Sequence, residues 1–476
     1  MTELTPQELA HRGSQFFRQR KFGAAARCFS RAIEAEPHAA SNYCNLSACK
    51  LELGDHAEAA RLAGRALELD PRMAAAHANR ADAQRLAGKL EDAVRDYRAA
   101  LQREPGNPVV LNKAGACLQL LERHDAARKH FEAALRIAPG FGLARLNLGL
   151  LDIVAGRPGP ALEHVHAAMK SGNLDPESAT VAKTAIQELG EHQRIQPSLD
   201  AALEARAPSL LLDTLGKTPA RLLKPHAPTV QWLDDVAASC RRLPAEANDL
   251  GYEADTTHLL YLEACAHARF ESDADTMAHT LQKIQGGRAE LEGATGRKVQ
   301  PLYAACRERQ ASEAATDSVT EFEAWIRYWH ATLVQGHSEA YPGQFKLVPN
   351  VLGVRDLLNS SPPGTVAGTV RHLASDIWTG IPPGVPRAVF LLLAIIEIHP
   401  FQDGNGRTGR FLMNRELEQC GLGPIPVFPS ERKPYIGALI NARQKRDAGI
   451  MFENLVAMRR TTDQRLTELN HAVARL

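Results

Sequence analysis

The sequence lacks a long apolar run, an excess of charge and closely paired cysteines. Its 476 residues carry a formal net charge of +1, and no segment gathers enough lysine and arginine for a nucleic-acid footprint. No stretch reaches the roughly 20 apolar residues of a transmembrane helix, and residues 1–8 are too polar for a secretory signal. The eight cysteines include no CxxC pair, which favours reduced thiols. We therefore expect a cytoplasmic protein whose partner is neither a nucleic acid nor a membrane.

What the sequence does contain is a repeat with a period of 34 residues across positions 1–170. Two alanine registers recur in every unit, at Ala25, Ala59, Ala93, Ala127 and Ala161 and at Ala32, Ala66, Ala100, Ala134 and Ala168. A third register is small, at Gly13, Ser47, Ala81, Gly115 and Gly149. A fourth is aromatic or apolar, at Phe29, Ala63, Tyr97, Phe131 and Val165, and proline ends four units, at Pro37, Pro71, Pro105 and Pro139. Small residues let helices approach closely and proline stops a helix, so each unit predicts a helical pair.

These registers resemble the tetratricopeptide repeat (TPR), whose units are helix–turn–helix pairs of this length. The resemblance implies an α-solenoid of five repeats over residues 1–170, which is enough for a stable stack. By analogy, the concave face of such a solenoid docks a peptide or a target protein, and a rigid spacer is the alternative. The repeat therefore predicts the fold specifically and leaves the ligand open.

The remaining chain also reads as mainly helical. Residues 171–245 are expected to form a solenoid cap and linker helices, because a capped helix start is followed by scattered prolines. The helical pattern returns over 246–460, and residues 461–476 remain as a C-terminal tail. Within residues 343–353, glycines flank β-prone residues and predict a short hairpin or flap. The expected fold class is all-α: a solenoid followed by a helical domain with one short β-hairpin flap.

The densest chemistry lies in residues 399–410, His-Pro-Phe-Gln-Asp-Gly-Asn-Gly-Arg-Thr-Gly-Arg. An almost wholly apolar stretch over 388–398 precedes it and reads as a buried helix. Residues 411–417 read as a second helix, whose first turn begins within the glycine–arginine segment. The loop therefore runs into a helix N-terminus, which favours an anion.

Each residue type in this loop suits a step of phosphate chemistry. His399 can take a proton from a hydroxyl, and Asp403 suits a hard divalent cation that also binds phosphate. Two glycines free backbone N–H groups to approach a phosphate, and two arginines clamp a polyphosphate: Gly404, Gly406, Arg407 and Arg410. Taken singly, these features are more often a capped helix end, a turn and a solvated face. Together they predict phosphoryl or nucleotidyl transfer from a Mg-bound nucleotide to a hydroxyl.

Residues 399–410 also match every fixed position of the Fic-domain signature, HPFx(D/E)GNGRxxR. The segment 343–353 resembles the Fic flap, and Tyr435 resembles the tyrosine that packs near the adenine, so the likeness covers roughly residues 246–460. The resemblance implies transfer of AMP from ATP to a Tyr, Thr or Ser hydroxyl of a target protein, with release of pyrophosphate. The solenoid would then recruit that target.

The resemblance also implies roles for individual residues. His399 would be the general base, and Asp403 would hold Mg²⁺. The nucleotide would be bound by the end of the flap, the loop and the helices beyond it: Leu352, Gly353, Val354, Arg355, Asp403, Gly404, Asn405, Gly406, Arg407, Thr408, Gly409, Arg410, Tyr435 and Arg443. Two positions depart from the family, because Arg443 stands where asparagine is frequent and Lys346 stands where arginine is common.

A regulatory element is the remaining candidate. Many Fic proteins restrain themselves with a helix bearing (S/T)xxxE(G/N), whose glutamate pairs with the second arginine of the signature. Residues 263–272 have a similar layout and place Glu271 at the glutamate position, with His267 and Ser272 in place of the flanking residues. Glu271 is therefore either an inhibitory partner of Arg410 or an ordinary solvated glutamate.

Three functions are consistent with the sequence. The first is a protein adenylyltransferase with a docking solenoid. The second is a Fic enzyme that transfers another group, such as UMP, or removes AMP, although Gly406 argues against the kinase-like variant, which has lysine there. The third is a TPR scaffold with a silent Fic domain. The sequence argues against this third function, because all catalytic positions of the signature are intact.

Overall fold

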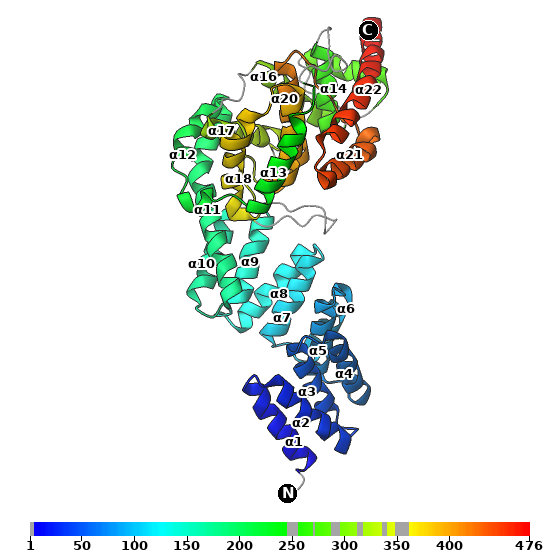
Figure 1. Cartoon of the computed structure of the whole chain (residues 1–476). Helices are drawn as coiled ribbons and strands as arrows, with labels where there is room; N and C mark the ends of the chain where they lie inside the picture. The colour runs from blue at the N-terminus through cyan, green and yellow to red at the C-terminus, as the bar shows by residue number, and fades with distance from the viewer. Residues whose placement is uncertain are drawn as a thin grey trace. The chain divides into compact units, whose positions relative to one another are not determined.

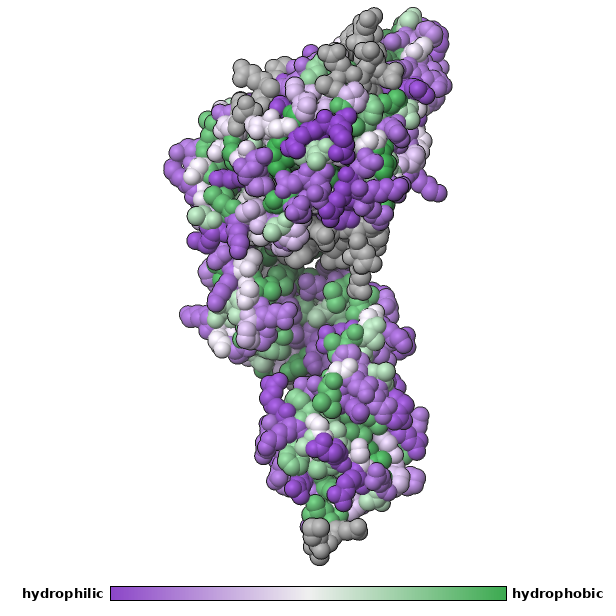
Figure 2. Space-filling model, viewed as in Figure 1, coloured by the Kyte–Doolittle hydropathy of each residue, from purple (hydrophilic) through white to green (hydrophobic). Residues whose placement is uncertain are grey.

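The computed structural model describes residues 4–244, 256–269, 272–286, 296–311, 318–335, 340–347 and 361–476. Within these residues every regular element is a helix, which confirms the predicted all-α class. The chain divides into two compact units, Met1–Ile186 and Gln187–Leu476 (Figure 1). In the described ranges, no helix is long and apolar enough to cross a membrane. On the face seen in Figure 2, hydrophilic residues cover much of each unit, with hydrophobic residues among them.

Unit 1 is built from consecutive helix pairs, as the 34-residue period predicts. In each pair the two helices pack against each other, and the second also packs on the first helix of the next pair. The helices are α1 (Pro6–Arg18), α2 (Phe22–Ala35), α3 (Ala40–Glu52), α4 (His56–Leu69), α5 (Ala74–Leu86), α6 (Leu90–Arg103), α7 (Pro108–Leu120), α8 (His124–Ile137), α9 (Gly142–Val154) and α10 (Pro158–Lys170). The next helix, α11 (Pro176–Ala205), begins in unit 1 and ends in unit 2.

The small register of the repeat is explained by close contact within each pair. A Cβ atom added to Gly115 on α7 would lie 2.6 Å from the ring of Phe131 on α8. In the first pair, a Cβ on Gly13 would lie 2.9 Å from the Phe29 ring. Both distances are too short for a real side chain, so the glycine and the buried aromatic residue belong together.

Unit 2 contains the Fic-like sequence and a set of helices of varied length. They are η1 (Pro208–Leu211), α12 (Leu212–Gly216), η2 (Ala220–Leu223), α13 (Ala227–Cys240), α14 (Thr256–Ala268), α15 (Ala274–Gln285), α16 (Gly296–Ala311), α17 (Val319–Leu333), η5 (Pro363–Thr365), α18 (Val366–His372), η6 (Leu373–Ile377), η7 (Trp378–Gly380), α19 (Val385–Ile398), α20 (Asn405–Gln419), η8 (Pro429–Glu431), α21 (Arg432–Lys445) and α22 (Ala448–Arg475).

Helix α19 is the centre of this unit. All its residues except Arg387 and Ile396 are buried, as expected for a helix that is apolar on every side. Helices α13, α18, α20, α21 and α22 pack around it. Because α19 leads directly into residues 399–404, this packing fixes the start of the signature loop.

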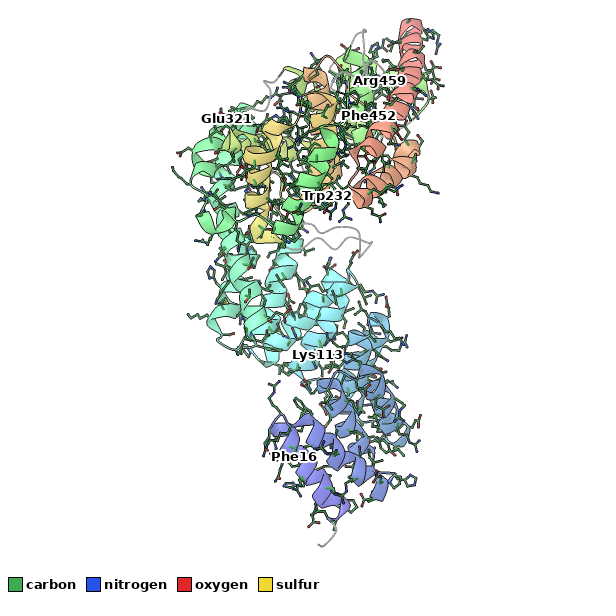
Figure 3. All side chains as sticks on the ribbon, viewed as in Figure 1. Phe16, Lys113, Trp232, Glu321, Phe452 and Arg459 are labelled. Carbon is green, nitrogen blue, oxygen red and sulfur yellow. The ribbon has the colours of Figure 1, made fainter. Side chains whose placement is uncertain are left out.

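The stretch expected to link the two parts contributes to the core of unit 2. Leu199 on α11 and Trp232 on α13 belong to the same buried cluster as α19. The Trp232 indole N–H donates to the carbonyl of Arg443 at 3.2 Å, and the side chain is labelled in Figure 3. Helix α22 likewise continues through position 460, and Leu469 is buried in this core. Residues 343–347 of the expected flap form no strand, and residues 348–353 lie outside the described part.

Candidate active site

The signature loop begins where α19 ends. His399 follows the helix in the left-handed conformation, with a φ of 50°, and its backbone N–H donates to the Ile395 carbonyl at 3.0 Å. Helix α20 begins directly after Gly404, whose φ is 81°. A Cβ at Gly404 would lie 2.7 Å from Cγ1 of Val334. Glycine is therefore required at 404 both by the backbone and by the nearby wall.

Asn405 closes the loop on itself. Its Oδ1 accepts the Phe401 backbone N–H at 2.9 Å, and its Nδ2 donates to the Phe401 carbonyl at 2.8 Å. The Phe401 ring is fully buried and stacks on His330, with ring centroids 3.6 Å apart. The sequence predicted a nucleotide contact for Asn405, whereas the structure uses both ends of its amide within the loop.

His330 on α17 joins the loop to the start of the flap segment. One ring nitrogen, Nε2, lies 2.9 Å from the Asp403 carbonyl oxygen, and the other, Nδ1, accepts the Gly343 backbone N–H at 2.9 Å. These partners fix a neutral tautomer with the proton on Nε2. Burial lowers the pKa of His330 to about 3, so the ring stays neutral. Sequence reasoning missed this residue, because no motif connects it to a loop 73 positions away.

His399, the predicted base, has a different environment. Its Nδ1 lies 3.4 Å from the Ile396 carbonyl oxygen. Because a carbonyl only accepts, this contact places the proton on Nδ1 and leaves a free lone pair on Nε2. Burial, together with the positive charge of Lys346, lowers the pKa of His399 to about 4. His399 is therefore neutral near pH 7, as a general base must be.

Lys346 attaches the described part of the flap to the loop. Its backbone N–H donates to the Pro400 carbonyl at 2.8 Å. The side chain is 1 % exposed, and its Nζ has no hydrogen-bond partner among the described residues. Burial lowers the pKa of Lys346 to about 7. The structure thus places a buried lysine next to the predicted base.

A cavity of about 320 Å³ opens beside the loop. Its polar lining is rich in arginine and consists of His267, Arg269, Asp403, Gly404, Gly406, Arg407, Arg410 and Arg432. The rest of its lining is mainly apolar and consists of Ala266, Ile396, Val427, Phe428, Pro429, Tyr435, Ile436 and Leu439. This combination suits a ligand with a polyanionic part and a flat apolar part.

The two signature arginines both reach this cavity from the first turns of α20. An Nη of Arg407 donates to the Leu333 carbonyl at 2.7 Å, which fixes its direction. Burial lowers the pKa of Arg407, and the charge of Arg410 lowers it further. The Arg410 guanidinium lies 5.7 Å from the ring centroid of the buried Tyr435. Two cations that line one cavity favour an anionic ligand.

Not every predicted nucleotide contact lines the cavity. Thr408 is fully buried, and Gly409 packs on α19, where an added Cβ would lie 3.4 Å from Cδ1 of Leu392. Arg443 is bound to the buried carboxylate of Glu397 and is absent from the lining. His399 lies outside this lining as well, although Ile396, on the preceding turn, is part of it. The other predicted residues lie outside the described ranges: Glu271, Leu352, Gly353, Val354 and Arg355.

Three polar lining residues were missed by sequence reasoning. His267 and Arg269 come from the end of α14, and Arg432 is the first residue of α21. Burial lowers the pKa of His267 to about 4, so this ring is neutral. No motif marks these positions, and α14 is more than 100 residues before the loop, so only the fold brings them together.

Helix α14 is held against α20 by a buried ionic network. The fully buried Arg309 of α16 donates to Glu263 on α14 at 2.5 Å and to Glu418 on α20 at 2.7 Å. Asn414 on α20 also donates to Glu263 at 2.8 Å. Burial opposes the ionisation of Glu263, but the charge of Arg309 outweighs it and lowers the Glu263 pKa. The cavity wall formed by α14 is thereby fixed relative to the arginines of α20.

Asp403 is the lining residue best suited to a metal ion. Its Oδ1 accepts the Gly404 N–H at 2.6 Å, and His330 holds its backbone carbonyl. Mg²⁺ commonly takes one or two protein carboxylates and completes its shell with substrate phosphates and water. A single carboxylate beside two arginines that could bind phosphate fits that pattern. Among the described residues, no group of three His, Cys, Asp or Glu side chains could hold a metal ion.

Both parts of the chain are similar to known proteins. Residues 319–417 match the Fic/DOC family, and residues 50–108 and 109–141 match tetratricopeptide repeat families. "Protein adenylyltransferase Fic" of Drosophila persimilis is 38% identical over 65 residues, which make up 14% of this chain and 13% of that protein. The protein of the same name from Drosophila melanogaster is 46% identical over 41 residues, 9% of this chain and 8% of that protein.

The chain therefore spans 13% or less of the length of these curated relatives. Among solved structures, a thermophilic TPR protein from Thermus thermophilus is 21% identical, covers 38% of this chain and 97% of its own, and has a TM-score of 0.33. This chain carries a Fic/DOC-family domain at residues 319–417 and tetratricopeptide repeats within residues 50–141.

Proposed function

We propose that this protein is a protein adenylyltransferase, which transfers AMP from ATP to a Tyr, Thr or Ser hydroxyl of a target protein. The observation that carries the proposal is one loop that holds a neutral His399 and also supplies Asp403, Arg407 and Arg410 to a cavity. The match to the Fic/DOC family and the printed name of the Drosophila relatives support it.

In this reaction the target hydroxyl approaches Nε2 of His399. The imidazole takes the hydroxyl proton while the oxygen forms a bond to the α-phosphorus of ATP. The bond from the α-phosphorus to the oxygen that bridges to the β-phosphate breaks, and pyrophosphate leaves with the electron pair. Arg407 and Arg410 stabilise the charge that collects on the phosphates. His399 then releases its proton to solvent and is again neutral.

The remaining site residues bind and orient. Asp403 would hold Mg²⁺, which when bound neutralises phosphate charge and favours departure of pyrophosphate. Gly404 and Gly406 let the backbone approach the phosphates, while Tyr435 and the apolar lining would receive the base. Residues 352–355 remain proposed as nucleotide contacts from the flap.

The decisive experiment uses the full chain with Mg²⁺ and ATP labelled at the α-phosphate. We expect label on the protein itself or on a protein of the source-cell lysate, and loss of the label with His399→Ala. His471→Ala, on the exposed side of α22, is the matched control and should label like the wild type. Persistent labelling by His399→Ala would overturn the mechanism.

Transfer of UMP is tested in the same experiment with UTP labelled at the α-phosphate. Arg443 is held by Glu397 and does not line the cavity, so its departure from the family does not by itself select another base. We therefore expect stronger labelling from ATP. Stronger labelling from UTP would show that UMP, not AMP, is the transferred group. If neither ATP nor UTP gives a label, a scaffold function is favoured.

We further propose that the solenoid recruits the target and that Glu271 restrains the site through Arg410. The first part is supported by the tetratricopeptide match, because stacked helical repeats form extended docking surfaces. The second is tested with Glu271→Gly, which should raise self-labelling. Equal labelling by Glu271→Gly and wild type would show that Glu271 is an ordinary glutamate.

A further inference from the structure

Two arginines of the cavity, Arg269 and Arg432, come from outside the signature loop, and the first of them has a position that the proposed reaction does not explain. Arg269 follows the last residue of α14, and its backbone N–H donates to Ala266 at 3.1 Å in a left-handed conformation with a φ of 56°. Its side chain is exposed at the cavity and has no hydrogen-bond or ion-pair partner within the described part of the chain. A cation in this position is available to a ligand.

Charge in the cavity is strongly unbalanced. The described lining contains four arginines and one carboxylate, that of Asp403, and His267 is neutral. A Mg²⁺ ion at Asp403 would make the surplus of positive charge larger. Such a site favours the ligand with the most negative charge, and each added phosphate group increases the negative charge of a nucleotide. The surplus therefore favours a triphosphate over a diphosphate.

The position of Arg269 relates it to the phosphates rather than to the base. Both side chains line the cavity, and the charge of Arg269 contributes to the lowered pKa of Arg407, so the two guanidinium groups are close enough to interact. Helix α14, which ends directly before Arg269, is fixed against α20 by the Arg309 network. Three guanidinium groups then approach one region from two elements, α20 and α14.

We propose that Arg269 is a third phosphate-binding arginine, which contacts the terminal phosphate of a nucleoside triphosphate and gives the cavity its preference for triphosphates over diphosphates. The inference rests on the proposed function only in taking the ligand to be a nucleotide. Arg407 and Arg410 keep the role that the proposed reaction gives them, which is to stabilise charge on the phosphates. Arg269 gains a contact only when the terminal phosphate is present.

The test is calorimetric binding of ATP, ADP and AMP, each with Mg²⁺, to the full-length protein. Arg269→Gln should weaken ATP binding by about 10- to 100-fold, the usual effect of losing a hydrogen bond between charged groups. ADP and AMP should change by less than about threefold, because they do not reach Arg269. Arg269→Lys, which keeps the charge, should recover part of the ATP affinity.

Arg460→Gln is the matched control, since Arg460 is exposed on α22 and does not line the cavity. Repeating the series with Glu271→Gly excludes an effect of that neighbouring glutamate. Equal weakening of all three nucleotides, or none, would overturn the inference. If ATP binds with this pattern but His399→Ala leaves AMP labelling intact, the proposed reaction fails and the role of Arg269 stands. If no nucleotide binds, the same variants are compared with tripolyphosphate as the ligand. Tripolyphosphate binding that Arg269→Gln does not weaken would refute the role of Arg269.

Discussion

Two histidines beside the signature loop differ in function because their nitrogen atoms have different partners. His330 uses both nitrogens, one toward Asp403 and one from Gly343, and has no lone pair left for catalysis. Among the residues that the structure describes, His399 has a partner only at Nδ1, which leaves Nε2 available as the proposed base. Burial keeps both rings neutral, so hydrogen bonding and not charge separates the histidine that joins the loop to α17 from the proposed base.

This environment predicts an unusual pH dependence of the reaction. The base must be unprotonated, so its contribution to the rate falls only as pH falls through the His399 pKa of about 4. We expect the single-turnover rate of self-labelling to show no acid limb from His399 between about pH 6 and about pH 8. The rate is measured over this range at saturating ATP. A half-maximal rate near 6.5, the ordinary histidine value, would contradict the burial of the base.

Lys346 predicts a pH-dependent loss of stability. Its folded pKa of about 7 lies below its ordinary value of 10.5, so between these values the unfolded chain binds more protons and stability rises with pH. Lys346→Met removes the buried ammonium and should raise the free energy of unfolding by roughly 2–4 kcal/mol near pH 6. The gain should shrink toward pH 10.

Urea unfolding at several pH values measures this difference. Lys433→Met, at an exposed position of α21, is the control and should change stability little. A gain from Lys346→Met that is independent of pH would mean that packing, not charge, limits stability at this position.

At the scale of elements, the Arg309 network holds α14 in position against α20. Arg309→Met would leave Glu263 and Glu418 buried without their counter-ion, and such a change commonly costs about 3–5 kcal/mol. Arg307→Met, two residues earlier on α16 and exposed, should cost little. Urea unfolding compares the two variants. A loss below about 1 kcal/mol for Arg309→Met would show that α14 is held by apolar contacts alone.

The signature made the loop predictable, because its residues are contiguous and each has a recognisable chemical type. The resemblance implies a nucleotide contact for Asn405, whereas both ends of its side-chain amide bond to the backbone of Phe401 and close the loop. Arg443 was assigned by its spacing from Tyr435, and the buried Glu397 that binds it follows only from the packing of α19. Arg269 and Arg432 reach the cavity from helices that are far from the loop in the sequence. No local sequence pattern predicts that these two residues lie near the loop.

At the scale of the whole molecule, the solenoid was the easier prediction. Its contacts join neighbouring repeats, so the period of the sequence is enough to predict which helices pack together. The core of unit 2 is assembled from Leu199, Trp232, α19 and α22, which are separated by long intervals in the chain. Their apolar patterns predicted helices, but not that the proline-rich stretch after residue 197 would belong to this core.

The division into two units predicts that stability and ligand binding can be perturbed separately. Phe131→Ala removes a fully buried ring from unit 1 and should cost that unit about 3–5 kcal/mol. Calorimetry of the full chain should show one transition lowered and another unchanged. All residues that line the cavity lie between Ala266 and Leu439, in unit 2, so the affinity for MgATP should stay the same.

The reciprocal variant is Phe452→Ala, because this residue packs against the core of unit 2 (Figure 3). It should lower the other transition and leave that of unit 1 in place. A single transition that moves with either substitution would show that the two units unfold together. In that case the folding of unit 1 and that of unit 2 are coupled, and a partner bound to one unit would stabilise the other by mass action.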